Sequence, residues 1–306
     1  MALVIRHGID VYWTINNVWD DKRVKDWLFM SSPFKPIAII AIYLLIVLKW
    51  GPKWMENRQP YKLDLIIKIY NLVQVACCLF LTIDVFLNTY ARGYSIICEP
   101  VDYSNDPVAV RIARIGHCYF LLKVLDLLDT IFFVLKKKNS HVSFLHVYHH
   151  AGMVALTWIG TKFVAGGHSV FTGWINSFVH VIMYLYYYLT TVDNKYKQSF
   201  WKKYITQLQM VQFGLMALHW LSLILSKDCG FPKFISFFML PQNAFIFALF
   251  FDFYMRAYGS KKPKTEEDVQ TEATKKYDLN QNIEPELNNK LNQSSISKVN
   301  QSKEMK

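Results

Sequence analysis

The sequence has few charged residues and few cysteines, which argues against a soluble domain and against a disulfide-rich scaffold. Only 19% of its 306 residues are charged, whereas 53% are hydrophobic and 16% are aromatic. This balance is typical of a membrane protein rather than of a soluble domain. Its five cysteines are too few for a disulfide scaffold. We expect no signal peptide, because residues 20–25 are mostly charged and precede the first apolar run.

Long apolar runs occupy much of the remaining sequence. A helix that crosses the hydrocarbon core needs ~20 mainly apolar residues, and runs of about that length predict seven transmembrane helices. Their approximate bounds are 34–50, 63–87, 110–135, 142–160, 169–190, 205–225 and 234–258. The expected fold class is therefore an all-α, polytopic membrane protein.

The net charge of +11 does not indicate nucleic acid binding, because no recognition helix or aromatic-basic groove accompanies it. Lys and Arg instead gather in alternate short loops, as the positive-inside rule describes. The richer loops lie within residues 49–62, 136–138, 195–203 and 256–262. This bias predicts a lumenal N-terminal segment (1–33), a seven-helix transmembrane domain (34–258) and a cytoplasmic tail (259–306). The tail is rich in Lys, Glu, Asn, Gln and Ser, so we expect it to be disordered.

Two cysteines fall in loops on the predicted lumenal side. Cys98 and Cys229 lie in separate loops, whereas Cys77, Cys78 and Cys118 lie within predicted helices. An oxidising lumen permits the two loop cysteines to form a disulfide. The alternative is two independent thiols, since the sequence gives no distance between them.

Charged and polar residues inside the predicted helices form stripes. A charged side chain at mid-membrane costs at least ~2.5 kcal/mol on insertion scales, so it needs a partner or a wet cavity. Residues three or four positions apart share one face of a helix, and four predicted helices each carry such a stripe. The stripes are Lys123, Asp126, Asp129 and Thr130; His146, His149 and His150; Asn176, His180, Tyr184 and Tyr187; and Thr206, Gln209 and Gln212.

These stripes also agree in depth. At ~1.5 Å rise per residue, they fall in one layer of the cytoplasmic half of the membrane, although neighbouring helices run in opposite directions. We therefore expect helices 2 to 7 to enclose a cavity open to the cytoplasm. Three histidines facing a fourth are hard to explain as structural groups, whereas His117, His219 or the glutamines alone fit that simpler role.

Basic residues are expected around the mouth of this cavity. They are Lys136, Lys138, Lys202 and Lys203, on the predicted cytoplasmic side. Their charges orient the chain in the membrane, and they also suit an anionic substrate such as the phosphates of coenzyme A.

Four segments resemble, in order and spacing, the signature boxes of the very-long-chain fatty acid elongases. They are residues 123–138 (KVLDLLDTIFFVLKKK), 144–150 (FLHVYHH), 176–187 (NSFVHVIMYLYY) and 206–212 (TQLQMVQ). The likeness runs from about the second helix through the seventh. Two departures are present: Asp126 stands where the family often has Glu, and the final KEMK lacks the dilysine spacing of many elongases.

The resemblance implies a 3-ketoacyl-CoA synthase of the endoplasmic reticulum membrane, an acyltransferase that needs no cofactor and no metal. It would join an acyl-CoA to the two-carbon unit of malonyl-CoA. Because no cysteine falls in the four boxes, we expect an imidazole to accept the acyl group. His149 is the candidate nucleophile, and His180 the group that polarises the malonyl thioester. Asp129 and His150 would orient His149, and His146 would support either role.

The other stripe residues and the basic residues are expected to bind substrate. They are Lys123, Asp126, Lys136, Lys138, Asn176, Tyr184, Tyr187, Lys202, Lys203, Thr206, Gln209 and Gln212. Lys123 would neutralise the buried carboxylates, and an apolar tunnel would hold the acyl chain, with His219 and Trp220 near its closed end. The expected partners are acyl-CoA, malonyl-CoA, the bilayer, and either a second copy of the chain or other enzymes of the elongation cycle.

Two other classes of protein remain open at this point. A membrane di-iron desaturase or hydroxylase also uses an HxxHH motif, but it needs several histidine clusters, and one is present here. A non-enzymatic receptor or transporter would place its polar residues along a path across the membrane or toward the outside. The sequence does not indicate the preferred acyl chain length, its unsaturation or the oligomeric state.

Overall fold

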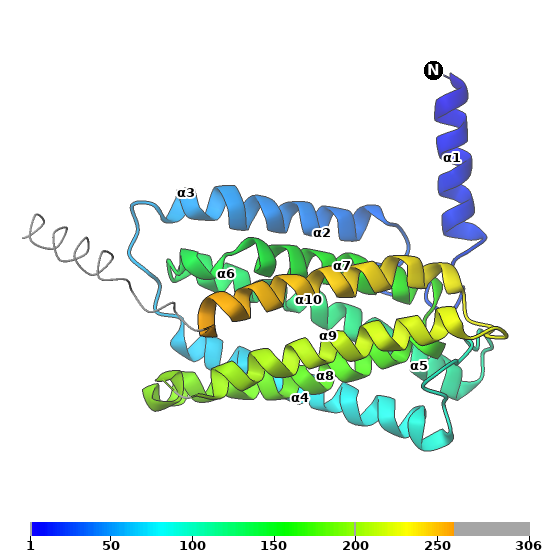
Figure 1. Cartoon of the computed structure of the whole chain (residues 1–306). Helices are drawn as coiled ribbons and strands as arrows, with labels where there is room; N and C mark the ends of the chain where they lie inside the picture. The colour runs from blue at the N-terminus through cyan, green and yellow to red at the C-terminus, as the bar shows by residue number, and fades with distance from the viewer. Residues whose placement is uncertain (1, 199, 260–306) are drawn as a thin grey trace, which may run out of the picture. The chain divides into compact units, whose positions relative to one another are not determined.

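The computed structural model describes residues 2–198 and 200–259, and within these ranges it contains helices and turns but no strand. The α-helices are α1 (Ala2–Asn17), α2 (Phe34–Leu45), α3 (Gly51–Met55), α4 (Asp64–Asn88), α5 (Pro107–Leu125), α6 (Leu127–Leu135), α7 (Phe144–Phe163), α8 (Val170–Val192), α9 (Trp201–Leu225) and α10 (Ser236–Tyr258). Short turns join them: the π-helical η1 (Ile46–Trp50) and the 3-10 turns η2 (Tyr90–Arg92), η3 (Asn139–His141), η4 (Gly167–Ser169), η5 (Asn194–Gln198) and η6 (Lys233–Ile235). The long helices lie side by side (Figure 1).

The chain divides into two units, Met1–Ala257 and Tyr258–Lys306. The first unit contains every residue that the site requires. The tail expected at 259–306 lies, apart from Gly259, outside the described residues.

The third predicted helix is two helices in the structure. α5 ends at Leu125 and α6 begins at Leu127, with Asp126 between them. The backbone N–H of Asp126 still bonds to Leu122 O at 2.9 Å, but the N–H of Asp129 bonds to Asp126 O at 3.2 Å. A hydrogen bond from residue i to residue i−3 tightens one turn of the helix, and the chain continues as a helix after it. The prediction of one continuous helix for 110–135 was therefore wrong. Helix α1 was not predicted at all.

Capping residues start two of the helices that carry polar stripes. Asp106 accepts a hydrogen bond from the Val108 N–H at 2.8 Å, and Pro107 occupies the first position of α5. Ser143 accepts one from the His146 N–H at 3.3 Å at the start of α7. Such caps satisfy N–H groups that have no partner within the helix. The cap at Ser143 therefore fixes the turn from which the three histidines project.

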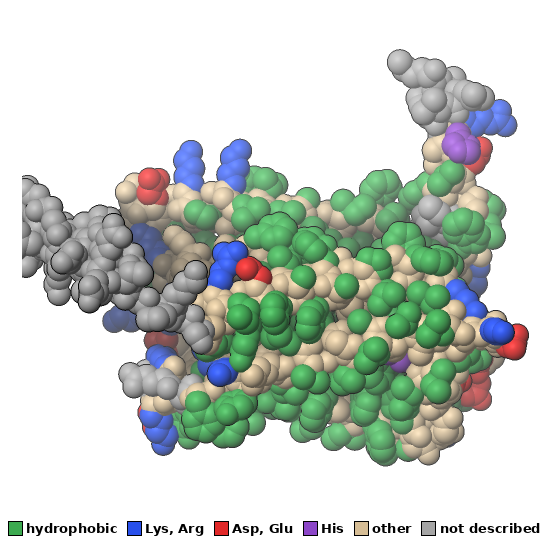
Figure 2. Space-filling model, viewed as in Figure 1, with side chains coloured by type: hydrophobic (Ala, Val, Ile, Leu, Met, Phe, Trp, Pro, Cys, Tyr) green, Lys and Arg blue, Asp and Glu red, His purple; other side chains and the backbone are tan. Residues whose placement is uncertain are grey.

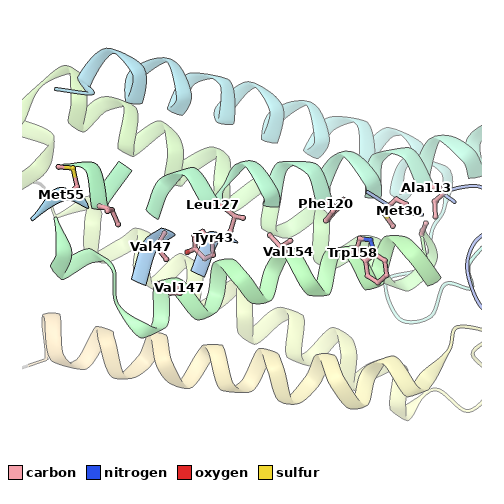
Figure 3. Close-up of a cluster of buried hydrophobic side chains, with 13 residues drawn as sticks. Met30, Tyr43, Val47, Met55, Ala113, Phe120, Leu127, Val147, Val154 and Trp158 are labelled. Carbon is pink, nitrogen blue, oxygen red and sulfur yellow. The ribbon is translucent and has the colours of Figure 1, made fainter. Parts of the chain in front are cut away.

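A large buried apolar cluster joins α2 to α5, α6 and α7. Figure 3 shows its side chains meeting between these helices. They include Met30, Tyr43, Val47, Met55, Ala113, Phe120, Leu127, Val147, Val154 and Trp158. Tyr43 connects the cluster to the polar interior, because its hydroxyl hydrogen-bonds with Thr130 Oγ1 at 2.8 Å. Close packing of this kind, rather than escape from water, holds helices together within a bilayer.

Apolar side chains cover the flanks of the helices. Figure 2 shows them along the visible face, with Lys and Arg mainly toward the two ends. Four stretches of the described chain are long and apolar enough to cross a membrane: Phe34–Met55, Asp64–Arg92, Trp201–Leu225 and Lys233–Tyr258. Leu65 and Leu225, about 70% exposed, fit contact with lipid. The prediction of an all-helical, polytopic membrane protein is confirmed at this level.

Loops at one end of the helices are tied together, and we call this the disulfide end. Cys98 and Cys229 form a disulfide, with Cα atoms 5.7 Å apart, so the bridge that the sequence permitted is present. The backbone N–H of His168 in η4 bonds to Glu99 O at 2.8 Å. The His168 ring stacks on the His219 ring, with centroids 3.7 Å apart. The loops before α5, before α8 and before α10 are therefore joined.

A buried ion pair fixes residues 20–30 to the same end. Asp20 Oδ2 lies 3.3 Å from Lys162 Nζ on α7, and both side chains are fully buried. Asp20 also pairs with Lys22. Burial raises the pKa of Asp20, but hydrogen bonds to Lys22 and Lys162 and the charges of these two lysines outweigh it and hold the pKa below its usual value. The carboxylate therefore stays ionised between two ammonium groups.

Removing the two partners of this pair is expected to have unequal effects. Asp20→Leu leaves the buried Lys162 ammonium without its carboxylate, so we expect a loss of about 3–5 kcal/mol in the free energy of unfolding. Lys162→Met leaves Asp20 paired with Lys22, so its loss is expected to be smaller. Thermal unfolding of the two purified variants measures the difference. Equal losses would show that the pair does not act in this way.

Candidate active site

Lys123, Asp126 and His180 form the centre of a buried polar network. Lys123 Nζ lies 2.9 Å from Asp126 Oδ2 and 3.3 Å from His180 Nδ1. All three side chains are at most 7% exposed. The three-residue step across the α5–α6 junction keeps Lys123 and Asp126 on one face, and α8 supplies His180. The ammonium therefore neutralises Asp126 and contacts a histidine at the same time.

The carboxylates of α6 and the junction bind tyrosine and glutamine. Asp126 Oδ1 accepts hydrogen bonds from Gln74 Nε2 at 2.7 Å and from the Tyr184 hydroxyl at 3.2 Å. The same hydroxyl lies 2.8 Å from Asp129 Oδ2, and Gln74 Nε2 also bonds to the Tyr70 hydroxyl at 2.9 Å. The side-chain hydrogen bond of Asp129 thus goes to Tyr184 on α8. The expected role of Asp129 in orienting a histidine of α7 stays a prediction.

The histidines of α7 form a row, as their spacing predicted. His146 Nε2 lies 3.0 Å from Thr130 Oγ1, and the rings of His146 and His150 are 4.2 Å apart between centroids. His150 also meets His149 edge to face at 5.6 Å. His149 itself packs against Phe213 of α9 and Phe250 of α10, with ring centroids 6.2 and 6.3 Å away. His150 therefore lies where it can position the ring of His149.

A long apolar cavity begins at His149 and runs toward the disulfide end. Side chains of α4, α5, α7, α8, α9 and α10 line it, and its empty volume is about 1150 Å³, including its opening. On α7 the lining runs from His149 to Val164, ~22 Å of helix at 1.5 Å per residue. Asn176 also lines the cavity and accepts a hydrogen bond from the Tyr119 hydroxyl at 2.8 Å. The cavity therefore has a polar beginning and an apolar length.

The far end of the cavity lies against the loops of the disulfide end. Val164, Gly166, Ser169 and Trp220 line it there, and Trp220 Nε1 donates to Thr172 Oγ1 at 3.1 Å. Trp220 thus lines the cavity near these loops, and its place at a closed end stays a prediction. His219 is not among the lining residues, because its ring stacks on His168 and Phe171.

Loss of the disulfide is expected to loosen the disulfide end. Cys98→Ala should lower the free energy of unfolding by up to about 4–5 kcal/mol, because the bridge closes a loop of more than ~100 residues, with the bilayer reducing the effect. Thermal unfolding with and without reductant measures it. Cys118→Ala, at a free cysteine, is the control and should leave the response to reductant unchanged. A Cys98→Ala variant with wild-type stability would contradict the expectation.

In the polar stripe of α9, two residues have contacts within the protein and the third has an unsatisfied amide. The Thr206 hydroxyl bonds to Lys202 O at 3.0 Å, and Gln209 Nε2 lies 3.4 Å from Met183 Sδ. Gln212 is fully buried, yet neither its amide nitrogen nor its amide oxygen has a hydrogen-bond partner. An unsatisfied buried amide is costly, but Gln212 does not line the cavity, so its contact with substrate stays a prediction.

Basic residues gather at the opposite end of the helices, around η3 and the start of α9, and we call this the basic end. Lys136 Nζ pairs with Asp64 Oδ1 at 2.5 Å, whereas Lys138, Lys202 and Lys203 are exposed. Burial, and then the charges of Lys138 and Lys202, lower the pKa of His141 in η3. The charges of both lysines therefore influence the same histidine. None of these basic residues lines the cavity.

Several residues of the network were not predicted. Tyr70 and Gln74 on α4 bind the carboxylate region, and Tyr119 on α5 places Lys123 against its ring at 5.0 Å. Their spacing carried a signal: Tyr70 and Gln74 are four residues apart, and Tyr119 precedes Lys123 by four. Uncharged polar residues in an apolar helix are common as structural hydrogen-bonding groups, which is why the signal was weak. Tyr187 packs against Tyr184 at 5.9 Å.

Within residues 2–198 and 200–259, no three His, Cys, Asp or Glu side chains are grouped so that they could hold a metal ion. The single histidine row thus lacks the additional ligands that a di-iron centre requires. The arrangement instead offers a row of imidazoles, a buried polar network around the Lys123–Asp126 ion pair and an apolar cavity. This combination suits acyl transfer from a long-chain substrate.

Comparison with known proteins places the chain in a family. The profile of the GNS1/SUR4 family matches residues 28–266, which include the four polar stripes and the lining of the cavity. The chain belongs to this family.

Three curated proteins illustrate the similarity. Very long chain fatty acid elongase 4 of Mus musculus is 45% identical over 267 residues, 86% of this chain and 83% of the relative. The same-named protein of Homo sapiens is 47% identical over 247 residues, 80% and 78%. Very long chain fatty acid elongase 7 of Drosophila melanogaster is 41% identical over 250 residues, 81% and 76%.

Membership of the GNS1/SUR4 family favours the enzymatic interpretation of the polar stripes. The receptor or transporter alternative and the desaturase alternative receive no support from these relatives, which are named as elongases.

Proposed function

We propose that this GNS1/SUR4 protein condenses a long-chain or very-long-chain acyl-CoA with malonyl-CoA. The products would be a 3-ketoacyl-CoA, CoA and carbon dioxide. The position of His149 supports this most directly, because its ring lines the start of a long apolar cavity beside a buried polar network. An acyl chain lying in that cavity would bring its thioester to the imidazole. The names of the curated relatives agree with this reaction.

In the first half-reaction, neutral His149 attacks the thioester carbonyl. A carbon–nitrogen bond forms, the carbon–sulfur bond breaks, and the CoA thiolate leaves and takes a proton from solvent. The acyl group remains on the ring as an acyl-imidazolium. Imidazole suits this role because it is nucleophilic when neutral. His150, whose ring meets that of His149, would hold it in the attacking orientation, and His146 would support His150 from the next turn.

In the second half-reaction, malonyl-CoA replaces CoA and loses carbon dioxide. The electron pair of the breaking carbon–carbon bond moves onto the malonyl thioester as an enolate. Its carbon attacks the acyl group, the carbon–nitrogen bond to His149 breaks, and neutral imidazole is regenerated. His180 would stabilise the enolate oxygen as an oxyanion-hole donor does. Asn176 and Gln212 would position the substrates, and Asp129 would help to orient the ring of His149. No cofactor is needed in this scheme, because both substrates arrive as activated thioesters.

The basic end would receive the CoA phosphates of both substrates. Lys138 and Lys202 are exposed at this end, and their charges would attract the phosphate groups. The cavity would then open to the cytoplasm on the side that faces these lysines. Lys136 and Lys203 would add to the positive field.

The same orientation follows from the positive-inside rule. We propose seven transmembrane helices in the endoplasmic reticulum membrane, with α5 and α6 together forming the third, a lumenal N-terminus and a cytoplasmic C-terminus. The disulfide end would then lie in the oxidising lumen, where a Cys98–Cys229 bridge is stable. Self-association, or association with other enzymes of the elongation cycle, would occur within the bilayer. Glycosylation at Asn292 or Asn300, each in an Asn-Gln-Ser sequon, would contradict this topology.

Two assays of the purified protein test the proposal. Labelled malonyl-CoA supplied with a panel of acyl-CoAs should give 3-ketoacyl-CoA products that are two carbons longer. Acyl-CoA supplied alone should release CoA and leave an acyl adduct on the peptide that contains His149, detected by mass spectrometry. Condensation with no release of CoA before malonyl-CoA is added would favour direct attack with a histidine as general base. Failure to condense any acyl-CoA would overturn the proposal.

A further inference from the structure

The contact between Lys123 and His180 fixes the position of a proton. A lysine ammonium has three N–H donors and no acceptor. Because Lys123 Nζ lies 3.3 Å from His180 Nδ1, that ring nitrogen can only accept the hydrogen bond, and it carries no hydrogen itself. In a neutral imidazole the hydrogen must then be on Nε2.

The competing tautomer does not fit the distances. A hydrogen on Nδ1 would need an acceptor, and the nearest carboxylate oxygen, Asp126 Oδ2, is 3.8 Å away. That oxygen already accepts from Lys123 Nζ at 2.9 Å, and the other oxygen of Asp126 accepts from Gln74 Nε2 at 2.7 Å. A hydrogen on Nδ1 would also face the hydrogens of the ammonium.

The ammonium itself is held in place. One donor goes to Asp126, another to His180, and Nζ lies 5.0 Å from the centre of the Tyr119 ring, within the range of a cation–π contact. Asp126 balances the charge, and the surrounding side chains leave Lys123 only 2% exposed. The ammonium therefore has few other positions available, and its hydrogen bond to His180 persists.

We propose that Lys123 is a positioning residue that holds His180 as the neutral tautomer protonated on Nε2, so that His180 serves as a hydrogen-bond donor and not as a base or nucleophile. The inference rests on the proposed condensation and deepens it by dividing the roles of the histidines. Nε2 lies on the side of the ring away from Nδ1 and hence away from Lys123. Asn176, one turn earlier on α8, lines the cavity, whereas His180 itself is not among its lining residues, so the proposal requires the malonyl thioester to reach past Asn176 to Nε2.

A fixed Nε2–H suits the second half-reaction. When malonyl-CoA loses carbon dioxide, the electron pair of the broken bond places negative charge on the thioester oxygen. A donor already aimed at that oxygen stabilises the charge without reorganisation. The proton stays on His180 throughout, and the enolate carbon, not the ring, takes the acyl group from His149. The first half-reaction needs no such donor on the malonyl thioester.

The two half-reactions should therefore respond differently to Lys123→Met. Removing one oxyanion-hole donor typically costs about 10²–10³-fold in rate, so we expect condensation to fall by about that factor. Release of CoA from acyl-CoA alone should stay near the wild-type rate. Because the variant leaves Asp126 without its cation, Lys123→Met with Asp126→Asn is measured beside it, and Lys162→Met, at the other buried Lys–Asp pair, is the matched control. Parallel loss of both half-reactions in the folded variants would overturn the proposal and indicate a structural role.

Substitution of His180 tests the donor directly. The side-chain amide of His180→Gln reaches about as far as Nε2 and donates, but it is neither a base nor a nucleophile. His180→Leu has the bulk without the donor. We expect His180→Gln to condense at least about tenfold faster than His180→Leu, within the range of one hydrogen-bond donor. Equal loss in the two variants would overturn the donor role.

Nitrogen-15 NMR of histidine-labelled protein reads the tautomer without any turnover. The signals that disappear in His180→Gln belong to His180, and its Nδ1 should be unprotonated in the wild type. In Lys123→Met the Nδ1 signal should move toward the protonated form. A wild type that condenses but carries hydrogen on Nδ1 would overturn this inference alone, whereas a wild type that does not condense would overturn the proposed function.

Discussion

Replacing His149 by alanine is expected to abolish the release of CoA from acyl-CoA. The variant removes the ring that lines the start of the cavity and meets His150, and no cysteine lies in the four polar stripes to accept the acyl group instead. Loss of a covalent nucleophile lowers rates by factors as large as ~10⁶ in other enzymes, so we expect a fall of roughly 10⁴-fold or more. A single-turnover assay with acyl-CoA alone measures CoA directly, before condensation can contribute.

His117→Gln is the matched control for this experiment. His117 is also a buried histidine of a long helix, but its Nε2 hydrogen-bonds to Leu28 O at 2.9 Å and it does not line the cavity. Glutamine can keep that bond, so CoA release should be unchanged. If His149→Ala still released CoA while His150→Ala did not, the nucleophile would be His150 and the assignment of the two rings would be reversed.

The sequence predicted which helices contribute to the site better than it predicted the bonds between them. The stripes at three- and four-residue spacing required one polar face per helix, and α5, α6, α7 and α8 do present theirs to one another. Which partners meet depends on side-chain length and rotation, which helical spacing does not determine. The bond between Asp129 and Tyr184, for example, could not be predicted from spacing. Gln74 escaped notice because a single uncharged amide in an apolar helix carries little signal.

The sequence predicted a cavity and an apolar tunnel for the acyl chain, but not their dimensions. Abundant Phe, Leu and Trp indicate that apolar side chains are available, but an empty volume depends on where small residues leave room. Glycines on α5, α7 and α8 lie in the lining, at Gly116, Gly160 and Gly173. A composition argument counts the large side chains and gives no weight to these gaps. Part of the lining therefore consists of residues without a side chain, which composition does not reveal.

Filling one of these gaps is expected to shorten the products. Gly160 lies among Leu156, Thr157 and Val164, which line the cavity at spacings of four, three and four, and a Cβ added there would meet no atom within 4 Å. A Gly160→Phe ring would occupy the cavity ~16 Å along α7 from His149. Each methylene that loses its apolar contact forfeits ~0.8 kcal/mol, about fourfold in kcat/KM. The longest acyl-CoAs should therefore fall by roughly 10²-fold or more, while short ones keep their rates.

A mixture of acyl-CoAs of increasing length, supplied with labelled malonyl-CoA, measures this shift in one reaction. Gly214→Phe is the control, because a Cβ there also meets open space. Its helical neighbours Val211 and Leu218 are 57% and 64% exposed, so its ring would face lipid. The control should leave the distribution of products unchanged. A uniform loss at every chain length in Gly160→Phe would mean that the cavity does not hold the acyl chain. Selective loss of the longest products would instead show that the distance from His149 to the introduced ring limits the length of the acyl chain.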